Sequence, residues 1–269
     1  MNTGFVGIGS MGGMLVRALL RSGALAPQEI WLANRSPAKI DAIAADFPGI
    51  HIAGAKQIAA SCDLILLCVS AADASGVLAQ MDGELDSDQL LVTTAAAIPL
   101  SSLEDRVPCR VAKLIPSITQ EIGAGIALVM YGSRLSPQDR NLLDNLLRHI
   151  SKPVEISESV ARPAIGLTSG GPALLAYLLQ SMADEAVRSN AELSPELSRE
   201  LVQETAGATM RLIKEANMSP EEIMRRVAVH GGMTALALEI LSQHVPQAWR
   251  KVFQATSERE TKTRESLAL

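Results

Sequence analysis

The sequence predicts an α/β domain followed by an all-α domain. From Thr3 to Ile156, short apolar segments suited to buried strands alternate with amphipathic segments of helical period. A glycine-rich turn joins the first such pair. From Val160 onward only helical periodicity remains. We therefore expect one domain over residues 1–159 and a second over residues 160–269.

The first strand and helix enclose a Gly-x-Gly-x-x-Gly pattern. The predicted strand Thr3–Ile8 includes Gly7 near its end and is followed by Gly9, Gly12 and the amphipathic segment Met14–Leu20. In this context the first glycine permits a tight turn, the second lets the backbone approach a pyrophosphate, and the third lets the helix pack closely on the strand. The pattern predicts a Rossmann dinucleotide-binding domain. The alternative is a purely structural turn between a strand and a helix.

The segment after the second strand bears on the choice of cofactor. Glu29–Ala33 is followed by Asn34, Arg35 and Ser36, where an NAD enzyme places an acid on the ribose 2′-hydroxyl. No acid is present, and an arginine can bind a 2′-phosphate bidentately. The sequence therefore favours NADP(H) over NAD(H). Ser36-Pro37 also has the pattern of a capped helix start, for a helix over Pro37–Phe47.

Two further strands should end beside the cofactor, because ligands bind at the carboxyl ends of parallel strands. Asp63–Val69 is the clearest buried strand, and Val69 and Ser70 stand at its end. Gln89–Thr93 leads into Ala95, Ala96 and Ala97, whose small side chains leave room for a nicotinamide or simply form a tight junction. The remaining elements expected in this domain are the strands His51–Ile52, Cys109–Ile115, Ile126–Tyr131 and Val154–Ile156 and a helix over 136–149.

The second half shows five interruptions of helical periodicity. These breaks are expected at Ser169–Pro172, Ser194–Pro195, Ser219–Pro220, His230–Gly232 and Val245–Pro246. A wide apolar stripe runs from Leu174 to Val187 and indicates either an ordinary core or a helical domain that interlocks with a second copy. The polar tail, residues 257–269, is expected to fray.

Composition restricts the partners. The chain has 269 residues, 48% hydrophobic but only 3% aromatic, so its core must use Ala, Leu, Ile, Val and Met. A net charge of −5 without a basic block argues against nucleic acid. No apolar run approaches the roughly 18 residues needed to span a bilayer, and the N-terminus lacks signal-peptide features, so no membrane association is expected.

The cysteine and histidine patterns bear on the location of the protein and on metal binding. Cys62, Cys68 and Cys109 are odd in number and form no C-x-x-C pair, which predicts reduced, structural thiols and a cytoplasmic location. The four histidines show no metal-ligand spacing. We therefore expect no metal site.

Several motifs resemble those of Δ1-pyrroline-5-carboxylate reductases. Thr168–Ala173 resembles that family's S-G-S-G-P-A segment, and Val227–Ala235 resembles its V-T-S-P-G-G-T-T loop. The N-terminal glycine segment, Ala33–Ser36 and Ala112–Pro116 also resemble the family. The pattern resembles the divergent competence-associated branch of the family more closely than its housekeeping reductases. β-Hydroxyacid dehydrogenases, which require a lysine on the helix after Pro172, are disfavoured because that helix has none.

The resemblance implies NADPH-dependent reduction of the imine pyrroline-5-carboxylate to proline, by a homodimer or a larger assembly built from it. It places the pyrophosphate on Gly7, Ile8, Gly9, Ser10, Met11 and Gly12, the 2′-phosphate on Asn34, Arg35 and Ser36, and the nicotinamide near Val69, Ser70 and the three alanines. It assigns substrate binding to Ser117, Thr168, His230, Gly231, Gly232 and Met233, and contact with the imine nitrogen to the hydroxyl of Thr234, the predicted catalytic residue. In the family this loop comes from the partner subunit.

Departures from the family pattern leave alternatives open. The Lys-Pro after the fourth strand is replaced by Ser70-Ala71, and in the loop Val229 and Met233 stand where the family has hydroxyl residues. His230 could replace a lost contact with the substrate or simply cap the next helix. Three functions follow as hypotheses: the reductase itself, a reductase with a more apolar substrate, or an NADP-binding regulatory or competence-related protein with lost or altered activity.

Overall fold

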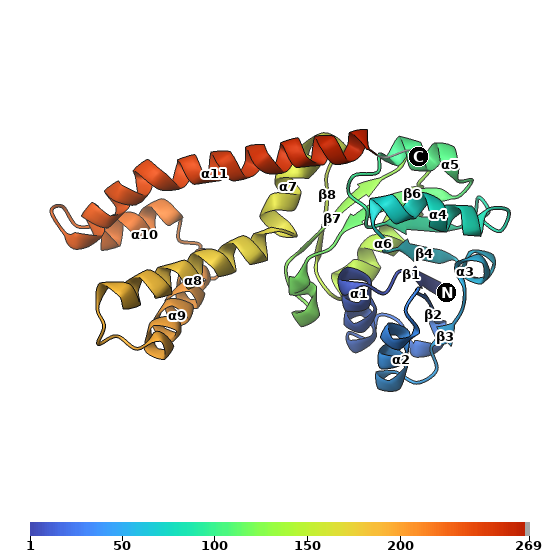
Figure 1. Cartoon of the computed structure of the whole chain (residues 1–269), viewed down its shortest axis with the longest axis horizontal. Helices are drawn as coiled ribbons and strands as arrows, with labels where there is room; N and C mark the ends of the chain where they lie inside the picture. Colours follow the sequence, from blue (N-terminus) through green and yellow to red (C-terminus); the bar gives the residue numbers. More distant parts are fainter. Residues whose placement is uncertain (267–269) are drawn as a thin grey trace. The chain divides into compact units, whose positions relative to one another are not determined.

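The structure, a computed structural model, describes residues 1–266. They form two compact units. The first combines Met1–Pro172 with the segment that begins at Thr256, and the second is Ala173–Ala255 (Figure 1). The domain boundary expected from the sequence, between residues 159 and 160, stays a prediction.

The first unit contains an eight-stranded sheet with the order β3-β2-β1-β4-β5-β6-β7-β8. All neighbouring strands pair in parallel except β6 and β7, which are antiparallel. The strands are β1 (Thr3–Val6), β2 (Ile30–Ala33), β3 (His51–Ile52), β4 (Leu64–Leu67), β5 (Leu90–Thr93), β6 (Arg110–Ile115), β7 (Ile126–Tyr131) and β8 (Lys152–Glu155).

Helices cover both faces of this sheet, because its central strands are apolar on both sides. One core cluster joins the sheet to α1 (Ser10–Arg21), α2 (Pro37–Asp46) and α6 (Pro137–Arg148). The other joins it to α3 (Ala55–Ser61), α4 (Ala71–Met81), α5 (Leu100–Arg106) and α7 (Ala161–Thr168). Short 3₁₀ turns η1, η2 and η3 occupy Pro27–Glu29, Ile118–Ile122 and Glu158–Val160. The predicted Rossmann architecture is confirmed. Strand β8 begins two residues earlier than expected, at an edge position where Pro153 is tolerated.

The second unit is helical. It contains most of α8 (Gly171–Ser189), all of α9 (Pro195–Lys214) and α10 (Pro220–Val227), and the greater part of α11 (Met233–Glu265). Four of the predicted breaks separate helices. The fifth prediction was wrong, because α11 continues through Pro246. A proline removes one backbone hydrogen bond and can kink a long helix without ending it.

The expectation that the polar tail frays is also wrong up to Glu265, where α11 ends. The tail is polar yet partly buried: the Glu260 side chain is 9% exposed and lies 2.8 Å from the Arg264 guanidinium and 3.6 Å from that of Arg162. Ion pairs thus attach this segment to the first unit. Residues 267–269 lie outside the described part of the chain.

The expectations about membrane spans, metal sites and disulfides can be compared with the described residues. Among residues 1–266, no helix is both long and apolar enough to cross a bilayer, and no three His, Cys, Asp or Glu side chains are grouped as metal ligands. Cys62, Cys68 and Cys109 form no disulfide. Burial raises the pKa of the Cys62 and Cys68 thiols to about 12 and that of Cys109 to about 11, so all three are protonated at neutral pH.

Candidate active site

The glycine turn after β1 is shaped by two close backbone contacts. Gly7 has φ +99°, and a Cβ there would lie 2.5 Å from the Cys68 carbonyl oxygen. A Cβ on Gly12 would lie 2.1 Å from the Gly7 carbonyl oxygen. By contrast, a Cβ on Gly9 would meet no heavy atom within 4 Å. The first and third glycines therefore allow tight packing, whereas Gly9 leaves the backbone open to a ligand.

The start of α1 is suited to an anion. Gly9 is its N-cap, no side chain caps the helix, and its first turn contains no acidic residue. Its N–H groups and the positive end of the helix dipole can bind a pyrophosphate, so the residues present fit a dinucleotide. Ile8 is 2% exposed and packs in the core. Met11 is half-buried against the same core, and Ser10 is exposed. Ile8 would therefore contribute its backbone.

A cleft of about 650 Å³ lies at the carboxyl ends of β1, β2 and β4. The predicted residues that line it are Gly7, Gly9, Asn34, Arg35, Val69 and Ser70. Ser36, at the N-cap of α2, and Ala95, Ala96 and Ala97, after β5, are not among the lining residues. The cleft thus gathers the glycine turn, the expected 2′-phosphate segment and the end of β4.

Two charged residues in this cleft, Lys39 and Asp73, were missed by sequence reasoning. Lys39 lies in the first turn of α2, just beyond the predicted 2′-phosphate segment Asn34–Ser36. Asp73 completes an N-cap pattern with Ser70, since the Ser70 hydroxyl accepts from the Asp73 amide at 3.2 Å. That serine-x-x-acid spacing was the available signal for Asp73.

Asn34 connects the two loops that form this cleft. Its side-chain oxygen accepts from the Ile8 amide at 3.0 Å, and its side-chain nitrogen donates to the Ser36 carbonyl at 3.0 Å. The asparagine therefore fixes the glycine turn against the loop after β2. Its geometry is that of a positioning residue.

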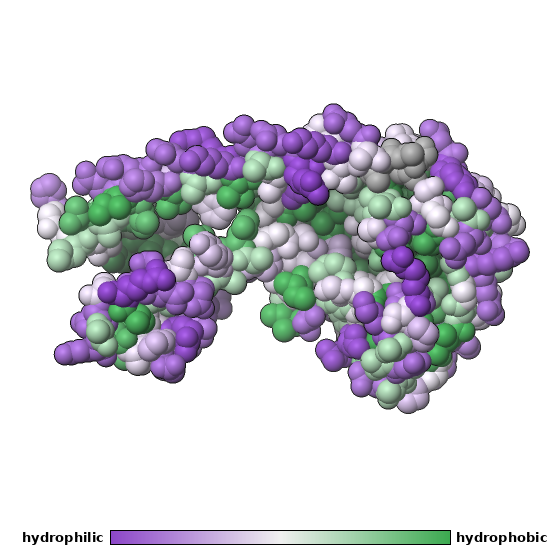
Figure 2. All heavy atoms as spheres, viewed as in Figure 1, coloured by the Kyte–Doolittle hydropathy of each residue, from purple (hydrophilic) through white to green (hydrophobic). Residues whose placement is uncertain are grey.

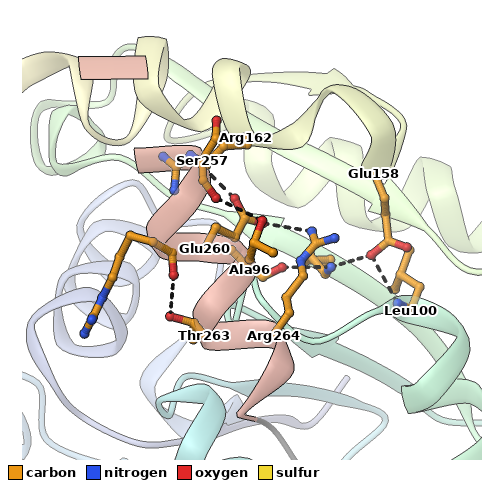
Figure 3. A network of polar contacts seen from close by, with 11 residues as sticks. Ala96, Leu100, Glu158, Arg162, Ser257, Glu260, Thr263 and Arg264 are labelled. Atoms are coloured by element: carbon orange, nitrogen blue, oxygen red, sulfur yellow. Dashed lines mark hydrogen bonds and ion pairs between the residues drawn. The ribbon is translucent and has the colours of Figure 1, made fainter. Parts of the chain in front are cut away.

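A buried lysine holds the alanine segment, and Figure 3 shows Ala96, Leu100 and Glu158 of this polar network. The Lys113 side chain on β6 is only 1% exposed, and its ammonium donates to the Ala96 carbonyl at 3.2 Å and to Glu158 Oε1 at 2.5 Å. The same Glu158 oxygen accepts from the Leu100 amide at 3.1 Å. Lys113 and Glu158 therefore fix the middle of the loop between β5 and α5 and the first residue of α5.

Burial dominates the electrostatics of this pair. It lowers the pKa of Lys113, and the hydrogen bond and charge of Glu158 offset part of that shift. Glu260 and Arg264, from the end of α11, act on the same ammonium with opposite signs. A lysine so arranged positions the backbone, because two of its three ammonium protons are already bound by protein oxygens.

Two predicted substrate residues, Ser117 and Thr168, lie together. Ser117 is 2% exposed. Its hydroxyl donates to the Thr168 carbonyl at 3.2 Å and accepts from the Thr119 hydroxyl at 3.1 Å. The Thr168 hydroxyl donates back to the Ala164 carbonyl within α7. Both hydroxyls therefore bond to the protein itself, and that of Ser117 joins the segment after β6 to the end of α7.

The remaining predicted substrate residues form the loop between α10 and α11 in the second unit. Gly231 has φ +71°, which favours glycine, and the Gly232 amide donates to the Val229 carbonyl at 3.0 Å. His230 and Thr234 are exposed, Met233 is 85% exposed and Val229 64%. The loop thus presents two apolar side chains beside its glycines.

Comparison with known proteins assigns the family. A family model described as pyrroline-5-carboxylate reductase dimerisation matches residues 158–263, and one described as NADP oxidoreductase, coenzyme F420-dependent, matches residues 2–97. Pyrroline-5-carboxylate reductase 3 of Bacillus subtilis is 32% identical over 94% of this chain and 93% of its own length. The chain belongs to the pyrroline-5-carboxylate reductase family. The predicted family, the two-part fold, NADP(H) as cofactor and the class of enzyme, an NADP-linked oxidoreductase, are confirmed at this level.

Two further similarities refine this picture. ComE operon protein 4 of Bacillus subtilis is 29% identical over 95% of the chain and 94% of its own length, so the resemblance to the competence-associated branch is confirmed too. The solved pyrroline carboxylate reductase of Plasmodium falciparum, with NADP bound, aligns with a TM-score of 0.83 and 20% identity over 99% of this chain and 98% of its own. That structural likeness shows the fold.

Replacing Lys113 by methionine tests the role of the buried pair. We expect the Lys113→Met protein to lose about 1–3 kcal/mol of unfolding free energy at pH 7, because Glu158 and the Ala96 carbonyl lose their donor. Since the folded-state pKa is lowered, the unfolded chain binds more protons between that pKa and 10.5, and wild-type stability should rise with pH through this interval relative to the variant. Urea unfolding over a pH series measures both effects.

The matched control is Lys56→Met, which removes an exposed lysine 3.4 Å from Glu84. It should change the unfolding free energy by no more than about 0.5 kcal/mol. Equal effects of the two substitutions would contradict the role assigned to Lys113.

Proposed function

We propose that this protein reduces 1-pyrroline-5-carboxylate to proline with NADPH. The observation that carries the proposal is the retention, in one chain of this family, of the open glycine turn at Gly9 and the Gly231-Gly232-x-Thr234 loop. We assign cofactor binding to residues 1–159, and substrate binding and dimerisation to residues 160–269.

When bound, NADPH would supply the hydride for the carbon of the protonated imine, whose nitrogen would become the secondary amine of proline. The protein's task in such a reaction is mainly orientation. Gly231 and Gly232 would bind the carboxylate through backbone N–H groups, and the Thr234 hydroxyl would contact the substrate nitrogen. Ser117 and Thr168 would shape the site, since their hydroxyls already bond within the protein.

A second candidate is an NADP-binding regulatory or competence-related protein of the same fold. Similarity to ComE operon protein 4 favours it, as do Val229 and Met233, which expose apolar side chains at positions where the family has hydroxyls. The same two side chains would also suit a reductase of a more apolar imine. Activity measurements separate these candidates.

We also propose a homodimer formed through the C-terminal helices. The match to a dimerisation model supports it, and so does the apolar surface of the helical unit. Leu175, Leu178 and Met182 of α8 are 60%, 41% and 63% exposed and recur at helical spacing. Figure 2 shows apolar side chains gathered over α10 and the first half of α11. A cytoplasmic location stays a prediction from the cysteine pattern.

The activity test is NADPH oxidation by purified protein with pyrroline-5-carboxylate, followed by cofactor absorbance. We expect turnover, and Thr234→Ala should lower kcat/KM roughly 10-fold because one hydrogen bond to the substrate nitrogen is lost. Thr234→Ser should restore most of the rate. Thr209→Ala, which removes a helical hydroxyl bonded to the Thr205 carbonyl, is the control and should leave kcat/KM unchanged. Folded protein that binds NADPH but does not turn over either this imine or larger, less charged ones would favour the regulatory alternative.

The cofactor preference is tested at Arg35. Arg35→Ala should raise the Kd for NADPH roughly 10-fold or more, because a charge-assisted bond to the 2′-phosphate is lost, while the Kd for NADH should change little. Fluorescence titration of both cofactors measures the ratio. Arg148→Ala removes an exposed arginine on α6, outside the cleft, and serves as the control. An unaltered preference in Arg35→Ala would refute the 2′-phosphate assignment.

The dimer is tested by placing a charge on α8. Leu178→Glu should shift the protein toward monomer, because burial of a carboxylate in an apolar interface is unfavourable. Leu142→Glu on α6 is closely matched, since Leu142 is 42% exposed and Leu178 41%. Sedimentation velocity at several concentrations reports the mass. A Leu178→Glu protein that stays dimeric, or a wild-type protein that is monomeric, would contradict the proposed interface.

A further inference from the structure

The cofactor cleft contains a carboxylate that faces the predicted 2′-phosphate arginine. Asp73, in the first turn of α4, lies with its Oδ1 3.5 Å from a guanidinium nitrogen of Arg35, in the loop after β2. Both residues line the cleft. The Arg35 side chain is 90% exposed and that of Asp73 41%, so the pair is accessible to a ligand.

The orientation of Asp73 is set by its own helix. Its second oxygen, Oδ2, accepts from the Ser70 hydroxyl at 2.7 Å, and its amide donates to the Ser70 hydroxyl at 3.2 Å. The N-terminus of α4 also favours a negative charge at this position. The carboxylate is thus held in place with Oδ1 directed at Arg35.

The charges lining the cleft are unequal. Among the described residues that line it, Arg35 and Lys39 are the cations and Asp73 is the one acid. A 2′-phosphate adds about −1.5 to −2 charges at pH 7, whereas the ribose hydroxyl of NAD(H) adds none. Only the phosphate therefore competes with Asp73 for the guanidinium.

We propose that Asp73 is a cofactor-specificity residue that limits the preference for NADP(H). NADP(H) binding exchanges the Asp73 carboxylate for the 2′-phosphate as the partner of Arg35, with Lys39 as a second cation, while NAD(H) binding leaves the Arg35–Asp73 pair intact. This rests on the 2′-phosphate role proposed for Arg35. It does not depend on the identity of the imine.

The test is calorimetric titration of the full-length protein with NADP⁺ and NAD⁺, without substrate. Asp73→Asn should lower the Kd for NADP⁺ about two- to five-fold, the range expected for an exposed ion pair, and leave the Kd for NAD⁺ unchanged. The gain should shrink at high salt, because exposed charges are screened. Asp46→Asn removes a carboxylate of α2 that pairs with Arg17 outside the cleft, and should have no effect.

Three companion variants separate charge from folding. Asp73→Gln keeps the capping geometry without the charge and should tighten NADP⁺ binding as Asp73→Asn does, even if the latter folds poorly. Asp73→Glu keeps the charge and should behave as wild type. In an Arg35→Ala background, Asp73→Gln should lose most of its effect, because the two residues act through one contact.

Several outcomes would overturn the proposal. An unchanged Kd for NADP⁺ in both neutral variants would show that Asp73 does not compete with the phosphate. Weaker binding of both cofactors would show instead that Asp73 accepts a ribose hydroxyl. Wild-type protein that binds neither cofactor would overturn the cofactor site and this proposal together. Normal binding without imine turnover would count only against the reductase function.

Discussion

The contact between the glycine turn and the end of β4 sets the geometry of the cofactor cleft. Gly7 lies where any Cβ would overlap the Cys68 carbonyl, and Gly12 lies where any Cβ would overlap the Gly7 carbonyl. These approaches bring the start of α1 to the carboxyl edge of the sheet, and Asn34 fixes the neighbouring loop to it through the Ile8 amide. The anion-binding end of α1 and the cations after β2 therefore open into one cleft.

The ion pairs Lys113–Glu158 and Arg35–Asp73 have different roles because one is shielded from solvent and the other is exposed. Lys113 and Glu158 lie where solvent has little access to the ammonium, so the pair fixes backbone around Ala96 and Leu100, and loss of one partner is costly. Arg35 and Asp73 are largely solvated, so their attraction contributes at most about 1 kcal/mol to stability. A contact that weak can be exchanged for a ligand without cost to the fold.

Sequence reasoning predicted the features that rest on local patterns. The strands, the glycine turn, the absence of an acid after β2 and four of the helix breaks follow from periodicity and from glycine and proline placement. It missed what depends on contacts distant in the chain. The approach of Lys113 to Glu158, 45 residues later, and the burial of Glu260 beside Arg162 leave no periodic signal. Lys39 and Asp73 were missed because they lie in the first turns of two different helices, α2 and α4, which the fold brings to one cleft. Pro246 was overestimated as a break, since the single helix α11 continues through it.

The protonation state of the three thiols has a practical consequence for spectroscopy. All are protonated at neutral pH, and maleimide-type reagents and spin labels react with thiolates. The native cysteines should therefore react little with such reagents. One cysteine introduced at an exposed polar position of α8, away from Leu175, Leu178 and Met182, and another on α6 would accept a fluorophore pair without removal of a native cysteine. Distance distributions between such labels, measured with and without cofactor, would test whether the separation of the two units changes on binding.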